Sequence, residues 1–317
     1  MSDRSFAPVM AGLIGLVAAS FGLALLLGNG SFGWPASDVD WRIVGEIRLP
    51  RALAALVTGS LLALAGALMQ VLLRNPLADP YVLGVSGGAA AFALGGMLLG
   101  LATIPTELLA FGGALVSSII VFVLGQGSGP WSTARMLLTG VVVAAGWGAL
   151  ISLMLALGDD QSLRGMLFWL MGDLSYARIS AWWLPGIAVI TLTMMLRARS
   201  LNILAAGETQ AALLGEDPRR RYTEIYVAAA ALTAVAVSIA GTIGFVGLIV
   251  PHLMRLIVGA DHRRLLPAAA LFGGAFLVLA DALARNLFSP RQLPVGVLTA
   301  LIGVPLFLIL LNRSGKK

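Results

Sequence analysis

The stretch ALAALVTGSLLALAGALMQVLL, residues 52–73, carries no charged side chain over its whole length. A helix of about twenty apolar residues rises roughly 30 Å, which is the thickness of the hydrocarbon core of a bilayer. The stretch therefore predicts a helix that crosses a membrane. The same pattern recurs along the rest of the chain, so the whole sequence has to be judged as that of a membrane protein.

Roughly ten such apolar runs can be found, each long enough to span a bilayer or close to it. We expect an all-α, polytopic protein whose spans are connected by short polar loops. The predicted spans are Pro8–Gly28, Ala52–Leu73, Tyr81–Leu101, Leu108–Leu124, Met136–Leu157, Ala181–Leu196, Ile225–Ala240, Ile243–Val258, Leu265–Leu283 and Leu293–Leu311.

The composition supports one transmembrane domain over residues 1–317. Hydrophobic residues make up 59% of the chain and charged residues 11%, and the mean hydropathy is +0.94. Soluble domains carry about 25% charged residues. The net charge of +6 comes from basic residues scattered between apolar runs, a distribution that disfavours a nucleic-acid partner. No cysteine is present, which excludes thiolate metal sites, and we expect no metal site in this chain.

The distribution of lysine and arginine predicts the orientation. With ten spans and both termini in the cytoplasm, about two-thirds of the basic residues fall in inner loops, as the positive-inside rule requires. We therefore expect a multi-pass protein of a bacterial inner membrane with both termini cytoplasmic.

Three segments predict more than simple connections. The outer segment Asn29–Ile47, with Trp34 and Trp41, predicts an interfacial cap with tryptophans at the level of the headgroups. The amphipathic stretch Gly158–Ser180 predicts a short helix that returns to the outer mouth, where Arg164, Met166, Phe168 and Trp169 are candidate pore-mouth residues or, alternatively, contact lipid. The last of these segments, the inner stretch Arg197–Tyr222, is too polar to cross the membrane and is expected to be folded.

Helical spacing over Ala205–Leu214 in this inner segment predicts a helix that ends at Gly215. Pro218 is typical of the first turn of a second short helix, which would carry Arg219, Arg220 and Arg221. Two short helices separated by a break at Gly215 would form a surface suited to a partner protein.

Several motifs occur together in a fixed order between about residues 45 and 307. They include Arg48-Leu49-Pro50-Arg51, Asn75-Pro76-Leu77-Ala78-Asp79-Pro80, Gly84-Val85-Ser86-Gly87-Gly88, Gly207-Glu208, Gly244-Phe245-Val246-Gly247-Leu248, Pro251-His252 and Leu293-Pro294-Val295-Gly296. In these motifs the chain resembles the permease family of ABC importers for iron chelates, haem and cobalamin.

The resemblance implies a type II importer fold, a homodimer, two cytoplasmic ATPase subunits and a periplasmic substrate-binding protein. The sequence contains no G-x-x-x-x-G-K-[ST] phosphate loop, so ATP and Mg²⁺ are expected on the separate ATPase and no cofactor on this chain. The expected role is that of a transporter subunit rather than an enzyme. Haem, ferric siderophore and cobalamin all stay open as substrates.

The resemblance also implies roles for three groups of residues. At the outer face, Arg48, Arg51 and Arg285 match positions that receive carboxylates of the binding protein; the alternatives are that these arginines anchor helix ends at the headgroups, or that Arg285 pairs with Asp281 one turn earlier. At the inner face, the segment from about 201 to 221 matches the coupling helices that contact the ATPase; the alternative is attraction of a basic loop to anionic lipid.

The candidate coupling residues are Gly207, Glu208, Gly215, Arg219, Arg220 and Arg221. The third group is the cytoplasmic gate, which the resemblance places at Thr133 and Ala134. The family has two adjacent hydroxyl residues there, so Ala134 departs from the pattern, and a helix N-cap by Ser132 or Thr133 is the alternative.

Two other classes of function were weighed. An ion-coupled secondary transporter would place carboxylates near the middle of its spans, whereas Asp281 lies toward an end. A rhomboid-like intramembrane serine protease would use Ser86 in Gly84-Val85-Ser86-Gly87 as its nucleophile and His252 as its base. Four such residues arise easily by chance in a glycine-rich membrane protein, and Ser86 is expected near the cytoplasmic end of its span. A hydrogen-bonded packing histidine is the simpler interpretation of His252.

Overall fold

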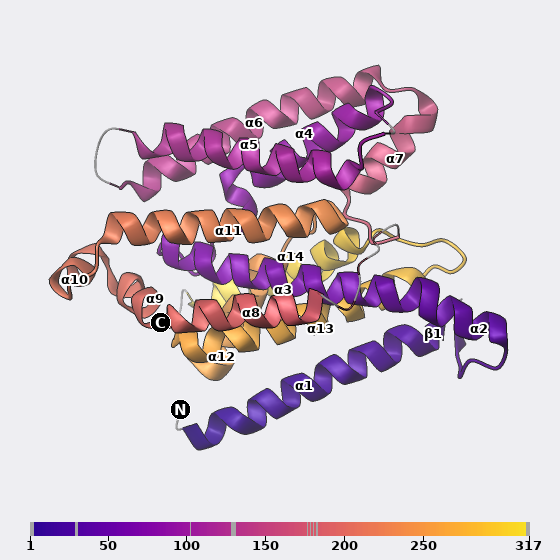
Figure 1. Cartoon of the computed structure of the whole chain (residues 1–317), viewed down its shortest axis with the longest axis horizontal. Helices are drawn as coiled ribbons and strands as arrows, with labels where there is room; N and C mark the ends of the chain where they lie inside the picture. The colour runs from indigo at the N-terminus through magenta and orange to yellow at the C-terminus, as the bar shows by residue number, and fades with distance from the viewer. Residues whose placement is uncertain are drawn as a thin grey trace.

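A computed structural model describes residues 3–28, 31–101, 103–127, 131–175, 177, 179, 181 and 183–314. Apart from the strands β1 (Leu27–Gly28) and β2 (Ser31–Phe32), which pair antiparallel, the regular structure of these residues is helical. The long helices run side by side along one direction (Figure 1). The prediction of an all-α fold is confirmed.

Each of the ten predicted spans coincides with one apolar helix. These helices are α1 (Asp3–Leu26), α3 (Leu49–Leu72), α4 (Val85–Leu98), α5 (Thr106–Gln126), α6 (Thr133–Leu157), α8 (Trp183–Leu196), α11 (Pro218–Ala240), α12 (Val246–Val258), α13 (His262–Asn286) and α14 (Val295–Ser314). In the described chain six helices are long and apolar enough to cross a bilayer, and α8 becomes a seventh together with α9 (Ala198–Ala206) across a 54° bend. The helices α4, α12 and α14 are apolar but shorter.

The helix α3 forms the centre of the bundle, since 94% of its apolar window is buried, and α11, α12 and α13 pack around it. Two of these contacts bring backbones together. A Cβ atom on Gly66 would lie 1.8 Å from the carbonyl oxygen of Gly247, and one on Gly59 would lie 2.2 Å from that of Gly273. Glycine is required at these crossings because helices in lipid associate through close packing rather than through the hydrophobic effect.

The outer segment before α3 is largely helical. The helix α2 (Asp38–Ile43) begins at Ser37, whose side chain and that of Asp40 form a capping box. It continues through the π-helical turn Val44–Arg48 into α3, so Asp38–Leu72 forms one continuous helix. The remaining short helices are the 3-10 turn Pro80–Leu83, α7 (Asp160–Leu170), as predicted for the outer mouth, and α10 (Glu208–Leu213).

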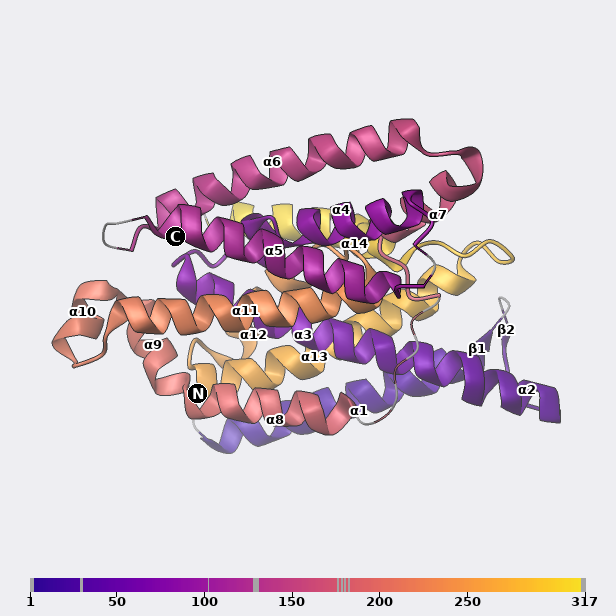
Figure 2. The ribbon, with the colours of Figure 1, turned by 45° about the horizontal axis from the view of Figure 1, so that its top comes forward.

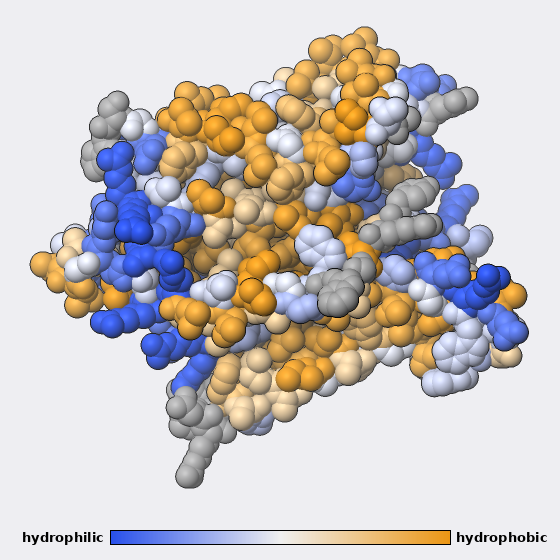
Figure 3. Space-filling view, in the orientation of Figure 1, coloured by the Kyte–Doolittle hydropathy of each residue, from blue (hydrophilic) through white to orange (hydrophobic). Residues whose placement is uncertain are grey.

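The surface has the polarity of a protein embedded in a bilayer. Figure 3 shows a broad apolar belt between two hydrophilic ends. Both ends of the described chain lie at the end of the bundle that carries α9 and α10 (Figure 1). The helix α6 lies on the outside of α4 and α5 (Figure 2), and only 6% of its apolar window is buried.

Candidate functional site

At the end of the bundle that carries α2, Arg51 of α3 is buried against Asp281 of α13. The Nε atom of Arg51 donates to both carboxylate oxygens at 3.0 and 3.1 Å, and its Nη2 atom donates to Oδ1 at 2.8 Å. The Nη1 atom donates to Ser175 and Gln292 at 3.1 and 3.2 Å. This bidentate geometry satisfies a guanidinium that is only 5% exposed.

Arg285 shares the same carboxylate. Its Nε atom lies 3.1 Å from Oδ2 of Asp281, one helical turn earlier, although the two are not aligned as a hydrogen bond. Its Nη2 atom donates to the carbonyl oxygen of Ala24 in α1 at 3.2 Å. Two cations therefore surround one buried carboxylate, and the cluster joins α1, α3 and α13.

These positions change the interpretation of the predicted docking arginines. Arg51 and Arg285 do not form an exposed rim, because both guanidinium groups turn inward to Asp281, and the alternative pairing of Arg285 with Asp281 is the one observed. Arg48 is half-buried, and its Nη1 atom donates to the carbonyl oxygen of Leu25 at 2.6 Å. Arg48, like Arg285, is thus partly accessible, whereas Arg51 is buried.

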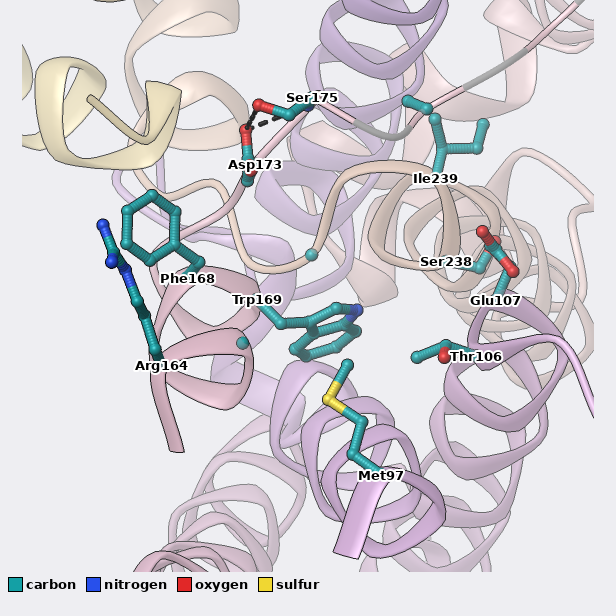
Figure 4. A pocket seen from close by; sticks show the side chains of 13 residues that line it. Met97, Thr106, Glu107, Arg164, Phe168, Trp169, Asp173, Ser175, Ser238 and Ile239 are labelled. Carbon is teal, nitrogen blue, oxygen red and sulfur yellow. Dashed lines mark hydrogen bonds between the residues drawn. The ribbon is translucent and has the colours of Figure 1, made fainter. Parts of the chain in front are cut away.

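A cavity of 590 Å³ adjoins this cluster, between α4, α5, α7 and α11. Figure 4 shows Trp169 and Met97 pointing into it, with Arg164 and Phe168 on one side and Glu107 on the other. The guanidinium carbon of Arg164 lies 5.8 Å from the centre of the Phe168 ring. Aromatic faces and charges of both signs thus line the cavity.

Three of the four predicted mouth residues, Arg164, Phe168 and Trp169, line this cavity. Met166 does not line it, because its side chain is fully buried in the hydrophobic core.

The cavity wall is connected to the buried ion cluster through Ser175. Its hydroxyl donates to Oδ1 of Asp173 at 2.7 Å and accepts from Nη1 of Arg51. Asp173 itself lies 3.9 Å from Nη2 of Arg51. A movement of the segment after α7 would therefore disturb the ion cluster and the cavity together.

At the opposite end of the bundle, the segment after α8 is divided differently from the prediction. The predicted helix over Ala205–Leu214 is broken at Gly207, whose φ of +127° is rarely adopted by L residues, and α9 and α10 lie on either side. Gly215, with a φ of +81°, follows α10 as predicted. Pro218 does begin a helix, but it is the full-length α11 rather than a short second helix.

Asp217 caps α11 by accepting from the backbone N–H groups of Arg219 and Arg220. The arginines behind this cap differ in their environment. Arg219 and Arg220 are exposed, whereas Arg221 donates to Glu216 at 2.7 Å and to Glu224 at 2.9 Å.

Glu224 accepts further from Arg197 at 2.9 Å and from Arg220 at 3.2 Å. Hydrogen bonds from the Ser200 hydroxyl and from Arg221 hold the pKa of Glu216 below its ordinary value of 4.5. Arg221 of α11 thus holds Glu216, which in turn accepts from Ser200 of α9, rather than extending to a partner. Glu208, at the first turn of α10, is half-buried.

The tip of this segment presents two leucines that the sequence analysis did not single out. Leu213 is 82% exposed and Leu214 is 67% exposed, at the end of α10. Figure 3 shows an apolar spot at this tip, beyond the hydrophilic residues at the same end of the bundle. Their position directly before Gly215, at a polar loop, was the signal that could have identified them.

At the predicted gate, the Ser132 side chain accepts from the backbone N–H of Arg135 at 3.4 Å and caps α6. Ser132 therefore acts as the N-cap of α6, which is the alternative to a gate that the sequence suggested. Thr133 is half-buried and Ala134 is exposed in the first turn of α6.

The protease alternative is not supported by the geometry. Ser86 lies in the first turn of α4 and His252 lies on α12. The buried Nδ1 atom of His252 has no hydrogen-bond partner, so it does not receive the Ser86 hydroxyl. The nucleophile and base that such chemistry requires are not assembled.

Comparison with known proteins identifies a family of transporters that matches nearly the whole chain. The model of the FecCD transport family matches residues 7–313. The chain is 42% identical over 304 residues to the cobalamin import system permease protein BtuC of Halobacterium salinarum, covering 90% of this chain and 80% of that protein. It is 40% identical over 311 residues to the hemin transport system permease protein HmuU of Yersinia pestis, covering 95% and 92%.

A solved structure shares the fold. A metal-chelate type ABC transporter in an inward-facing conformation superposes with a TM-score of 0.87 at 30% identity, covering 97% of this chain and 99% of that one. The ten apolar helices, the family match and these relatives agree with one another. The chain therefore belongs to the FecCD transport family, and it is the membrane permease subunit of an ABC importer.

Proposed function

We propose that this permease takes up a large metal chelate, namely a ferric siderophore, haem or cobalamin, by alternating access. Two copies of the chain form the pathway, two cytoplasmic ATPase subunits hold ATP and Mg²⁺, and a periplasmic protein delivers the substrate. The relatives named for cobalamin and hemin support this substrate class. Family membership also leaves the ion-coupled carrier and the protease without support.

The proposed orientation places the α10 end of the bundle in the cytoplasm of a bacterial inner membrane. Support comes from the basic residues that gather there, including Arg197, Arg219 and Arg220, and from the positive-inside rule. Both termini would then be cytoplasmic, because both ends of the described chain lie at this end of the bundle.

The observation that carries the proposal is the exposed leucine pair at the tip of α10. Leu213 and Leu214 are exposed at the end of α10, the helix at the tip of the polar end of the bundle. Large exposed apolar side chains in a polar rim are typical of a protein interface. We propose that they enter a groove of the ATPase, with Arg219 and Arg220 at the rim. Motion of α9 would then reach α11 through Glu216, which accepts from Ser200 of α9 and from Arg221 of α11.

Reconstitution with the ATPase tests this proposal. Leu213→Glu and Leu214→Glu should each release the ATPase during purification and should abolish ATP-dependent uptake. Val39→Glu is the matched control, because Val39 is also an exposed apolar residue, at 64%, but lies on α2 at the opposite end. Full ATPase binding and uptake by both leucine variants would refute the proposal.

A second copy of the chain is supported by the exposure of α6. Its inner half presents Leu138, Val141 and Val142, which are 59–70% exposed. This apolar face and the first turn with Thr133 and Ala134 would lie beside their counterparts across the dimer axis, where these two residues would narrow the cytoplasmic exit.

The outer cavity would then form one side of the substrate entrance. Trp169 and Phe168 offer flat apolar faces for a ring system, and Arg164 offers a cation for an acidic side group.

A further inference from the structure

A groove of 430 Å³ lies at the inner end of the bundle between α8 and α11, separate from the outer cavity and from the α10 tip. Its floor is Leu68 of the central helix α3. Its walls are apolar and come from α8, α9 and α11, namely Met194, Leu201, Leu204, Ile225 and Ala228.

The polar groups of the groove gather at its cytoplasmic rim. Arg197, with a side chain that is 61% exposed, and Arg221 both contribute to this rim and both donate to Glu224. Arg220 donates to the same carboxylate, and Glu216 is the second acidic group. Three guanidinium groups thus face two carboxylates, which leaves a net positive rim.

Inside the groove, the other polar side chains are already satisfied. The Thr193 hydroxyl donates to the carbonyl oxygen of Ile190, and the Ser200 hydroxyl donates to Glu216. Neither needs a hydrogen bond from a ligand, so the interior selects for an apolar occupant.

The exposed residues beside the groove indicate that it opens toward lipid. Leu192 and Leu196 of α8 are 57% and 77% exposed, and Val227 of α11 is 58% exposed. Apolar side chains exposed on spanning helices face lipid, and the groove lies at the inner ends of these helices, at the depth of the headgroups. An apolar slot with cations at the interface complements a phospholipid that carries a negative headgroup.

We propose that this groove binds one anionic phospholipid, with its phosphate at Arg197 and an acyl chain along Leu68, Met194 and Ile225. The groove separates α8 and α9 from α11, and α9 continues into the coupling tip at α10. A bound lipid would therefore set the position of the tip, so that ATP hydrolysis by the assembled transporter depends on anionic lipid.

The first test measures binding to the purified full-length chain by native mass spectrometry in detergent. Dioleoylphosphatidylglycerol should bind with a stoichiometry of one per chain, and dioleoylphosphatidylcholine should bind at least about five-fold more weakly, since each basic contact contributes about that factor. Glycerol 3-phosphate should not compete, because it has no acyl chain to fill the groove.

Two pairs of variants locate the site. Ala228→Phe fills the groove and should abolish the specific binding, whereas Val227→Phe places the same ring on the lipid side of α11 and should leave it unchanged. Arg197→Gln should weaken the binding about five-fold, and Arg263→Gln, an exposed arginine outside the groove, should not.

In nanodiscs, with the ATPase attached, removal of phosphatidylglycerol should lower ATP hydrolysis in the wild type but not in Ala228→Phe. Equal binding of both lipids, or equal binding by Ala228→Phe and Val227→Phe, would overturn the proposal. So would displacement of the lipid by glycerol 3-phosphate, which would identify a headgroup-only site. These results do not depend on the transported substrate, so they can fail while the importer function stands.

Discussion

Arg51 and Asp281, which lie 230 positions apart in the chain, are joined by three buried hydrogen bonds of 2.8–3.1 Å at the end of the bundle that carries α2. The pair fixes α3 against α13, and Arg285 adds a second cation to the same carboxylate. Further along, the two helices meet closely at Gly59 and Gly273, and the Ser60 hydroxyl donates to the carbonyl oxygen of Ala270. The ion cluster adds the contact that fixes their register at its own end.

Asp281→Asn should destabilise the protein strongly. The substitution leaves the Arg51 guanidinium buried without its counter-charge, which costs about 3–5 kcal/mol when a buried pair is broken from one side. We expect a clear fall in the midpoint of thermal unfolding in detergent, followed by circular dichroism. The control is Glu46→Gln, because Glu46 pairs with Arg42 at 3.9 Å while both side chains are more than 70% exposed. That exposed pair should contribute under about 1 kcal/mol. An equal effect of the two substitutions would contradict the role of Asp281.

The fold could be predicted from the sequence because lipid imposes a simple requirement on length and polarity. Each of the ten predicted spans contains one helix, although α4 and α12 are shorter than a full crossing. Hydropathy does not reveal whether a helix continues through a polar segment. The capping box at Ser37 starts a helix that runs through Arg48 into α3, where the sequence suggested only an interfacial connection.

The site was predicted in part. Matching motifs singled out Arg51 and Arg285, which the structure brings to one carboxylate, but their burial depends on Asp281, a partner that is distant in sequence from Arg51. The break at Gly207 was missed because its neighbours favour a helix, and only its positive φ shows the interruption. Leu213 and Leu214 were passed over because hydropathy assigns leucine to lipid or core.

Arg48→Glu should weaken docking of the periplasmic binding protein to the reconstituted transporter by about ten-fold or more, mainly through slower association. Rim charges orient an approaching partner and contribute to its rate of arrival. Surface plasmon resonance at two salt concentrations should show both the loss and a weaker salt dependence. Arg263→Glu, at the inner end, makes the same charge change and should leave docking intact. Normal docking by Arg48→Glu would exclude Arg48 from the interface.

Gly66→Ala should disrupt the packing of α3 against α12. The new methyl group would lie 1.8 Å from the Gly247 carbonyl oxygen, so the helices must separate, at a cost of about 1–3 kcal/mol. The fraction of monodisperse protein after size-exclusion chromatography and the midpoint of thermal unfolding measure this cost. Gly15→Ala in α1 meets no atom within 4 Å and should be neutral or slightly stabilising. Equal behaviour of the two variants would show that the close crossing is not required.

The stability of the inner segment should depend on pH through Glu216. Hydrogen bonds from Ser200 and Arg221 hold its pKa in the folded protein below its ordinary value of 4.5. A lowered pKa stabilises the folded state above the ordinary value, and this contribution is lost as the pH falls through the folded value. Glu216→Gln should therefore be less stable than the wild type at pH 7, by about 1–2 kcal/mol, and the difference should shrink as the pH falls from about 5 to 3. Thermal unfolding over this range measures the difference, and Glu208→Gln makes the same charge change at a residue of α10 and should show little effect at pH 7. A deficit of Glu216→Gln that stays constant down to pH 3 would mean that Glu216 acts through packing rather than through its charge.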